Sequence, residues 1–306
     1  MGRFLPRVSL LLVAALSLAP PGAGAVTVDG RLEPAYGAPV SVQSTQTGFV
    51  DADPALSPNP TLYADGSELD VAYGTISDGV LHLLLAGDLG FCCPSMFSHQ
   101  EAFDLFIDSK PGGQNMLRAD NATEGCCVGG TLNAFAGLRF DDGFVPDYWF
   151  ECTVNMACRF AELPTGGGGT GFDLGYNTGG APGTLSGGTN PHDIRAAVDN
   201  SNGAGVTQGC ASSSGAGVTT GVEWAIPLAA IGDPTGCVTV TAFASNAESH
   251  AIGNQVLDPL PPGTCALGAP SGVDFAAIAG AQTFTVCPDP SPARGVTWGR
   301  IKLLYR

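Results

Sequence analysis

The chain has 306 residues, with 28 acidic and 12 basic residues and a formal net charge of −16. Six of the basic residues lie between positions 26 and 290, against all 28 acidic ones. A surface this acidic repels a phosphate backbone, which excludes nucleic acid as a partner of this part of the chain.

Residues 1–25 have the pattern of a secretory signal peptide. Arg3 and Arg7 form a basic start, LLLVAALSLA is a short apolar core, and Ala23-Gly24-Ala25 is a small-residue cleavage site. The apolar run is too short to cross a bilayer, and no later run is long enough. We therefore expect a mature chain that begins near Val26, has no transmembrane segment, and is extracellular or at the cell surface.

The central part of the chain alternates short β-type segments with glycine-rich connectors. Ser77-Asp78-Gly79 separates two such segments and predicts a hairpin. The segment that follows it, VLHLLLAGDL (80–89), is apolar on both faces, which is typical of a strand inside a covered sheet. Many short strands without a long helical stripe predict an all-β sandwich with long Gly-rich loops over residues 26–290.

Asp104 and Asp108 lie in the predicted strand FDLFID (103–108), on the face that also carries Phe106. Residues four apart on a strand are separated by about 13 Å. That is too far for the paired carboxylates of a glycosidase. We expect a solvated face or a turn cap, with Asp108 bonding backbone N–H groups of the following turn SKPGG. Calcium ligation by Asp104 and Asp108 is the alternative, because calcium takes carboxylate and carbonyl oxygens.

The adjacent aromatic residues Tyr148 and Trp149 are the candidate ligand-binding residues. Neighbours on a strand point to opposite faces, so one of the two can face outward, where its ring could stack on a sugar. The interpretation that we favour for Trp149 itself places it in the core. The sequence contains none of the H-E-x-x-H, G-x-S-x-G or phosphate-loop motifs, and we expect no catalytic activity.

Ten cysteines in an exported chain predict disulfides. Proximity in the sequence favours Cys152–Cys158, Cys210–Cys237 and Cys265–Cys287. It also favours pairing of Cys92 or Cys93 with Cys126 or Cys127. Sequence alone does not fix any of these pairs. A four-cysteine zinc site is the alternative, and adjacent cysteines fit its spacing poorly.

The last segment, residues 291–306, is basic and contains no acidic residue. Trp298, Ile301, Leu304 and Tyr305 have the spacing of a short amphipathic helix. We consider two roles for it: a sorting or anchoring signal, and a tail that docks on the acidic body or remains unstructured.

Several segments, among them VDGRLEPAYG (28–37), FDLFIDSKPGGQN (103–115) and VTTGVEWAIPLAAIG (218–232), resemble a family of uncharacterised secreted bacterial proteins, and FIDSKPGGQN is a fairly specific phrase of that family. The layout is more distantly similar to the DOMON-like sandwich of family-nine carbohydrate-binding modules. The shared pieces are a D-G-x-L opening and the E-x-x-I-P pattern of Glu223, Ile226 and Pro227. This resemblance implies a jelly-roll-like antiparallel sandwich with calcium and sugar binding.

The chain departs from that family in two respects. Only Trp149 aligns loosely with the aromatic residues that hold sugar in those modules, and the cysteine doublets are not part of the pattern. The sequence thus predicts a secreted, disulfide-stabilised, non-catalytic sandwich that binds carbohydrate or another cell-envelope ligand, with calcium as the only cofactor considered. The alternative is a structural or surface-display protein without a small-molecule ligand.

Overall fold

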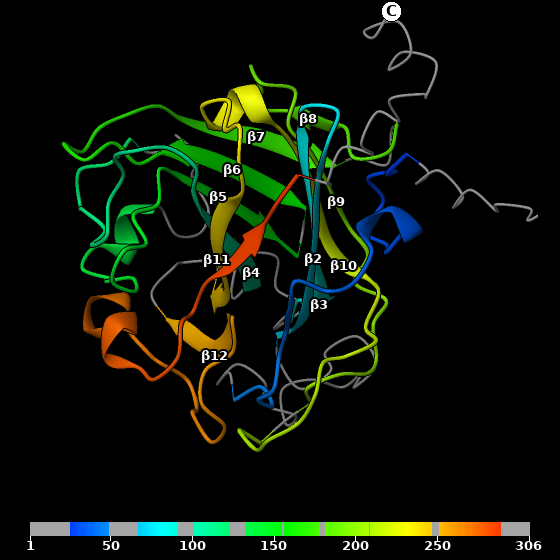
Figure 1. Ribbon diagram of the computed structural model, residues 1–306, viewed down its shortest axis with the longest axis vertical. Coiled ribbons are helices and arrows are strands. Elements are labelled where there is room, and N and C mark those ends of the chain that lie inside the picture. Colours follow the sequence, from blue (N-terminus) through cyan, green and yellow to red (C-terminus); the bar gives the residue numbers. More distant parts are fainter. Residues whose placement is uncertain are drawn as a thin grey trace, which may run out of the picture.

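The computed structural model describes residues 25–48, 67–90, 101–122, 132–154, 156–177, 181–207, 209–246 and 251–288 (Figure 1). Two antiparallel sheets pack against each other. The first has the strand order β1 (Ser41–Val42), β2 (Glu68–Ser77), β3 (Val80–Asp88), β10 (Gly221–Pro227) and β9 (Arg195–Val198). The prediction of an all-β antiparallel sandwich is confirmed.

The second sheet is the larger one. Its order is β12 (Ile252–Leu257), β11 (Val238–Asn246), β4 (Glu101–Asp108), β5 (Tyr148–Thr153), β6 (Ala157–Glu162), β7 (Gly171–Asn177) and β8 (Leu185–Gly187), and β13 (Phe284–Val286) also pairs with β11. The described helices are short 3₁₀ turns: η1 (Pro34–Tyr36), η2 (Leu132–Phe135), η3 (Leu228–Ile231), η4 (Pro270–Gly272) and η5 (Phe275–Ala277). Within the described ranges, no helix is long and apolar enough to cross a membrane.

The β2–β3 hairpin forms where the sequence predicts it. Ser77 pairs with Val80, and the two turn residues Asp78 and Gly79 both have positive φ angles, of 50° and 78°. Two consecutive residues of positive φ are typical of the type I′ turn, whose twist matches that of the strands on either side. β3 then lies in the centre of its sheet, between β2 and β10.

The main core lies between the two sheets. Leu81, Leu83 and Leu85 of β3 are fully buried in it. The ring of Trp224 in β10 meets that of Phe150 in β5 edge to face, with centroids 5.6 Å apart, so this pair joins the sheets. Fully burying a leucine or phenylalanine side chain stabilises the fold by roughly 1.5–3 kcal/mol.

A second apolar cluster covers the other face of the larger sheet. Phe106, Trp149 and Phe243 point to this outer face and are fully buried there. The chain that covers them includes η2 and η5, which contribute Phe135 and Phe275. Figure 1 shows these covering segments in green and orange beside the sheet. The larger sheet therefore has a core on each side over its central strands.

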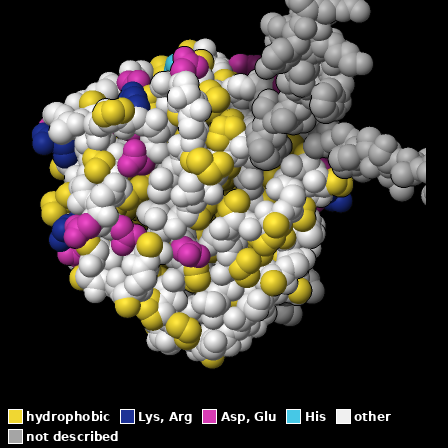
Figure 2. Space-filling view, in the orientation of Figure 1, with side chains coloured by type: hydrophobic (Ala, Val, Ile, Leu, Met, Phe, Trp, Pro, Cys, Tyr) yellow, Lys and Arg dark blue, Asp and Glu magenta, His cyan; other side chains and the backbone are white. Residues whose placement is uncertain are grey.

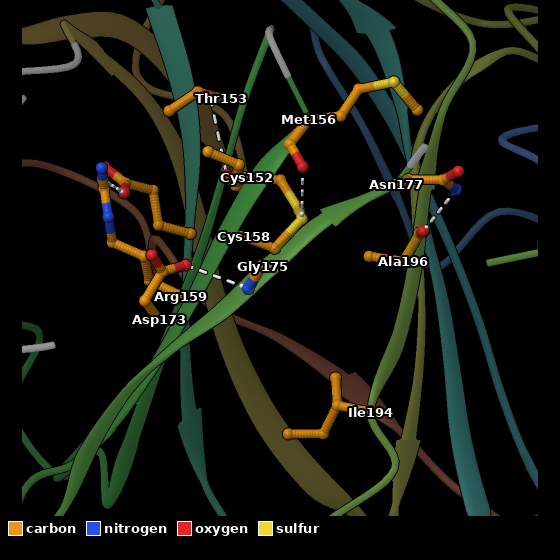
Figure 3. Close-up of a disulfide and its surroundings, with 12 residues drawn as sticks. Cys152, Thr153, Met156, Cys158, Arg159, Asp173, Gly175, Asn177, Ile194 and Ala196 are labelled. Carbon is orange, nitrogen blue, oxygen red and sulfur yellow. Dashed lines mark hydrogen bonds and ion pairs between the residues drawn. A yellow bond between two sulfur atoms is a disulfide. The ribbon is translucent and has the colours of Figure 1, made fainter. Parts of the chain in front are cut away.

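A row of charged residues crosses the outer face beside that cluster. The strand register places Asp104 opposite Glu151, Glu151 opposite Arg159, and Arg159 opposite Asp173. Arg159 forms an ion pair with Glu151, and both side chains are buried. Figure 3 shows Arg159 and Asp173 on one side of the sheet, with the Cys152–Cys158 disulfide and Ile194 on the other.

Three disulfides link the described residues, and one of them, Cys152–Cys158, is a predicted pair. It joins β5 to β6 in the main core. The other two are Cys210–Cys265 and Cys237–Cys287, which span 55 and 50 residues. The doublets at 92–93 and 126–127 lie outside the described residues, as do residues 1–24 of the predicted signal peptide and the predicted tail.

The predicted pairs Cys210–Cys237 and Cys265–Cys287 are therefore wrong, and the strand register explains why. Val238 at the start of β11 pairs with Val286 at the end of β13. This places Cys237 beside Cys287, although 50 residues separate them in the sequence. Pairing the nearest cysteines ignores such long-range strand contacts.

Candidate functional site

Trp149 does not line an open groove. Its side chain is 0% exposed, and its indole Nε1 donates a hydrogen bond to Asp104 Oδ1 at 2.8 Å. Tyr148, on the opposite face, is buried in the main core. The interpretation that places Trp149 in the core is confirmed, and neither residue faces solvent, because the outer face of the larger sheet is itself covered. Strand alternation predicts which face a residue occupies but does not predict a layer built from distant segments.

Asp104 is also buried, which corrects the expectation of a solvated face. Besides the Trp149 hydrogen bond, its Oδ2 accepts one from Ser245 Oγ at 2.5 Å. Burial raises the pKa of the Asp104 carboxyl group, while the two hydrogen bonds and the Arg159 charge oppose the rise. Both oxygens of Asp104 are used within the protein.

Asp108 has a role different from the predicted one. Its Oδ2 accepts a hydrogen bond from the backbone N–H of Val145 at 3.0 Å. The turn after β4 is capped instead by Asp147, whose Oδ2 accepts the N–H groups of Ser109 and Lys110 at 3.1 and 3.0 Å. Within the described ranges, no three acidic, histidine or cysteine side chains are grouped as metal ligands, at Asp104, Asp108 or elsewhere.

An open pocket of about 260 Å³ lies at the end of the larger sheet, where β4 ends, β5 begins and β6 ends. It is lined by residues 110–113, Asp147 and residues 162–165. The strand register accounts for its position, because Tyr148 is paired with both Ile107 and Glu162. The three strand ends are therefore held side by side, and the turn SKPGG forms one wall. We call this cavity the Lys110 pocket.

Lys110 contributes the only basic group in the lining of this pocket. Its Nζ donates a hydrogen bond to Tyr148 Oη at 2.6 Å and lies 4.5 Å from the centre of the same ring. The hydrogen bond and the charges of Asp147 and Glu162 raise the pKa of Lys110 despite its partial desolvation. Lys110 therefore carries a positive charge at neutral pH. Tyr148, one of the two candidate ligand-binding residues, is not part of the pocket lining, and its side chain holds Lys110 at the pocket.

Asp147 contributes a carboxylate at 2% exposure. Oδ2 accepts two backbone hydrogen bonds, whereas Oδ1 is buried without a hydrogen-bond partner. Burial raises the pKa of Asp147, and the two backbone N–H groups and Lys110 lower it. Buried polar atoms without a partner are rare in folded proteins and often indicate a ligand, ion or water. No sequence pattern singles out Asp147, because the residue precedes a strand like many turn aspartates.

A second cavity of about 390 Å³ lies between two Gly/Ser-rich loops. It is lined by residues 201–205, Ser214 and residues 216–220. Its lining carries hydroxyl, amide and backbone groups and no charged side chain. The Lys110 pocket is the stronger candidate site, since it combines a lysine, two carboxylates and an unpartnered buried oxygen.

Figure 2 shows scattered acidic side chains on one face of the molecule, several of them beside a Lys or Arg side chain. Comparison of the chain with protein families, with curated proteins and with solved structures gives no match in any of the three. The site's own geometry must therefore support any proposal about function.

Proposed function

We propose that this protein is a secreted, non-catalytic β-sandwich module that binds carbohydrate of the cell envelope through the Lys110 pocket. A sugar presents hydroxyl groups that both donate and accept hydrogen bonds. The pocket offers the matching set: Lys110 as donor, the carboxylates of Asp147 and Glu162 as acceptors, and the Thr165 hydroxyl as either.

The observation that carries this proposal is the unpartnered Oδ1 of Asp147. A Cβ atom placed on Gly112 would lie 3.5 Å from this oxygen and 3.9 Å from Thr165 Oγ1. Because glycine has no such atom, no side chain at position 112 stands between these two oxygens. A ligand hydroxyl in the pocket donates to Asp147 Oδ1 after a small shift that exposes this buried oxygen. Pro111 and Pro164 add apolar surface to the lining.

The proposed location outside the cytoplasm has separate support. Three disulfides link the described residues, and such bonds persist in oxidising compartments. The predicted signal peptide over residues 1–25 agrees with that location. The resemblance to family-nine carbohydrate-binding modules favours sugar as the ligand class.

The proposal is tested by screening the purified protein on a glycan array and measuring the affinity of each hit by calorimetry. Lys110→Met removes the pocket's cationic donor and its hydrogen bond to Tyr148 but keeps a long apolar side chain over the Tyr148 ring. We expect it to weaken binding by about tenfold or more, the equivalent of about 1.4 kcal/mol. Arg195→Gln is the matched control, because this exposed arginine on β9 makes only a 3.8 Å ion pair with Asp193. The control should bind like the wild type.

Three results would overturn the proposal: full binding by Lys110→Met, absence of binding to every glycan, or hydrolysis of a bound glycan. The second result, combined with loss of surface retention when residues 291–306 are deleted, would favour a structural or surface-display protein instead.

A further inference from the structure

The positive charges of the body are almost all paired. Between positions 26 and 290 the sequence contains six basic residues, and all six are described. Five of them form ion pairs with an aspartate or glutamate: Arg31, Arg118, Arg139, Arg159 and Arg195. Lys110 has no carboxylate within 4.0 Å among the described residues. Its ammonium group is held by Tyr148, through both the hydroxyl group and the ring.

Neither carboxylate of the Lys110 pocket forms an ion pair within 4.0 Å with a described residue, and Lys110 acts on both only at longer range. Asp147 Oδ1 has no hydrogen-bond partner. No hydrogen bond or ion pair joins the Glu162 carboxylate to any described residue, although its backbone N–H is bonded to Thr170. With one lysine and two carboxylates, the pocket carries a net negative charge. A negative charge held away from water is stabilised by a cation that also donates hydrogen bonds.

The type of cation follows from the number of ligands available. Calcium takes six to eight oxygen ligands, usually with several carboxylates among them. The pocket offers two carboxylates and one side-chain hydroxyl, fewer oxygen ligands than calcium takes. An organic ammonium group has three N–H donors. Asp147, Glu162 and Thr165 supply three acceptor groups around one cavity.

We propose that the ligand of the Lys110 pocket is an amino sugar whose free ammonium group binds between Asp147 and Glu162. This inference rests on the proposed function and deepens it, because it specifies a deacetylated amino sugar rather than a neutral one. The acidic body supports it further, since six basic residues against 28 acidic ones attract a polycationic glycan over long range. Lys110 remains available to donate to a neighbouring hydroxyl group of the same ligand.

The test compares three oligosaccharides of equal length, made of glucosamine, N-acetylglucosamine or glucose, by calorimetry at pH 6 and low salt. We expect the glucosamine oligomer to bind about tenfold tighter than either of the others, because an added charge contact of about 1.4 kcal/mol corresponds to that factor. Its affinity should fall as sodium chloride is added, since salt screens exposed charges.

Two variants assign the effect to the pocket. Glu162→Gln keeps the shape of a partly exposed side chain that makes no hydrogen bond, so it should fold normally. Asp147→Asn keeps one oxygen for the Ser109 and Lys110 N–H groups. Each should reduce the affinity for the glucosamine oligomer by about tenfold and that for the glucose oligomer less than twofold. Asp193→Asn, at an aspartate whose side chain is 84% exposed outside the pocket, is the control with the same change in charge.

The outcomes separate this inference from the proposed function. Equal or tighter binding of the neutral or acetylated oligomer would overturn the inference and leave the module a carbohydrate binder. If the protein binds none of the three oligomers and no other glycan, both this inference and the proposed function are overturned. Glucosamine binding that survives in both Glu162→Gln and Asp147→Asn would show that the ammonium group binds elsewhere.

Discussion

The Tyr36 hydroxyl group donates a 2.6 Å hydrogen bond to Glu223 Oε1, and this buried contact ties the first described segment to the smaller sheet. The other oxygen of Glu223 accepts the backbone N–H groups of Asp29 and Gly30 at 2.7 and 2.8 Å. The D-G-x-L opening and the E-x-x-I-P segment, which lie nearly 200 residues apart in the sequence, therefore meet at one carboxylate. The glutamate in the second segment is a structural residue.

The first prediction concerns the dependence of stability on pH. Burial raises the pKa of Glu223 to about 7, that of Asp70 to about 7 and that of Asp88 to about 8. A carboxyl group with a raised pKa binds its proton more tightly in the folded state than in the unfolded state. It therefore stabilises the fold fully below the unfolded-state pKa of about 4, and this stabilisation is lost as pH rises to about 8. We expect the Tm to fall by roughly 5 °C or more between pH 5 and pH 8.5.

Differential scanning calorimetry across that pH range measures the effect. Glu223→Gln removes one of the carboxyl groups with a raised pKa, so its Tm should depend less on pH than that of the wild type. A Tm that stays constant or rises toward pH 8.5 would contradict the prediction.

The sequence predicted the sandwich because its signals are local. The apolar run over 80–89, which predicts a covered strand, and the Asp78-Gly79 turn are both read from adjacent residues, and both are confirmed. The environment of Trp149 depends instead on Phe135 and Phe275, which come from distant segments that cover the outer face. The alternation of side chains along a strand gives no information about such distant covering segments.

The candidate site was missed for the same kind of reason. The turn SKPGG pointed to the correct region, but the sequence assigned its cap to Asp108. The cap is Asp147, which reaches the turn because β4 and β5 are antiparallel neighbours. Tyr148, a candidate ligand-binding residue, does not line the pocket and instead holds Lys110. The order of the strands determines which acidic residues lie together at one end of a sheet. Local sequence patterns do not reveal that order.

The second prediction concerns the buried contact between Trp149 and Asp104. Trp149→Phe removes the indole donor, so one oxygen of a buried carboxylate loses its partner. Hydrogen bonds to charged groups contribute about 1.5–3 kcal/mol, and the smaller ring leaves additional space. We expect the free energy of unfolding to fall by at least about 2 kcal/mol, as measured by urea denaturation.

A double-mutant cycle with Asp104→Asn isolates the contact itself, and it should give a coupling energy of about 1 kcal/mol or more. Trp149→Phe should leave the affinity for any glycan unchanged, since Trp149 is 0% exposed. A strong loss of glycan affinity in a variant that unfolds like the wild type would restore Trp149 as a ligand-binding residue.

The third prediction is an order of disulfide reduction. Cys152 and Cys158 are buried in the main core at 0% and 1% exposure, whereas Cys237 and Cys287 are exposed. Thiol–disulfide exchange requires a thiolate to reach a sulfur atom, so access controls its rate. Under a mild reductant, alkylation and mass mapping should find Cys237 and Cys287 labelled before Cys152 and Cys158. Labelling of the buried pair first would show that β5 and β6 separate more readily than the fold implies.

The fourth prediction concerns the wall of the Lys110 pocket. Gly113 has a φ of 79°, and a Cβ atom there would collide with the carbonyl oxygens of Val145 and Pro146. Gly143 has a similar φ of 91°, but a Cβ atom there would have no neighbour within 4 Å. Gly143→Ala should therefore lose only the backbone preference, about 1–2 kcal/mol. Gly113→Ala should lose that amount plus an overpacking term of about 1–3 kcal/mol.

Urea denaturation measures the loss in free energy of unfolding for each variant. Because the two glycines have nearly equal φ, the backbone contribution is the same in both and cancels in the difference. Gly113→Ala should also displace the backbone that carries Lys110 and Gly112, and it should weaken glycan binding beyond its effect on stability. Gly143→Ala should bind like the wild type, because residue 143 lies outside the lining of the pocket. Equal losses of stability in the two variants would mean that the turn after β4 shifts to accept a methyl group. In that case the position of the pocket wall would not depend on the close contact of Gly113 with Val145 and Pro146.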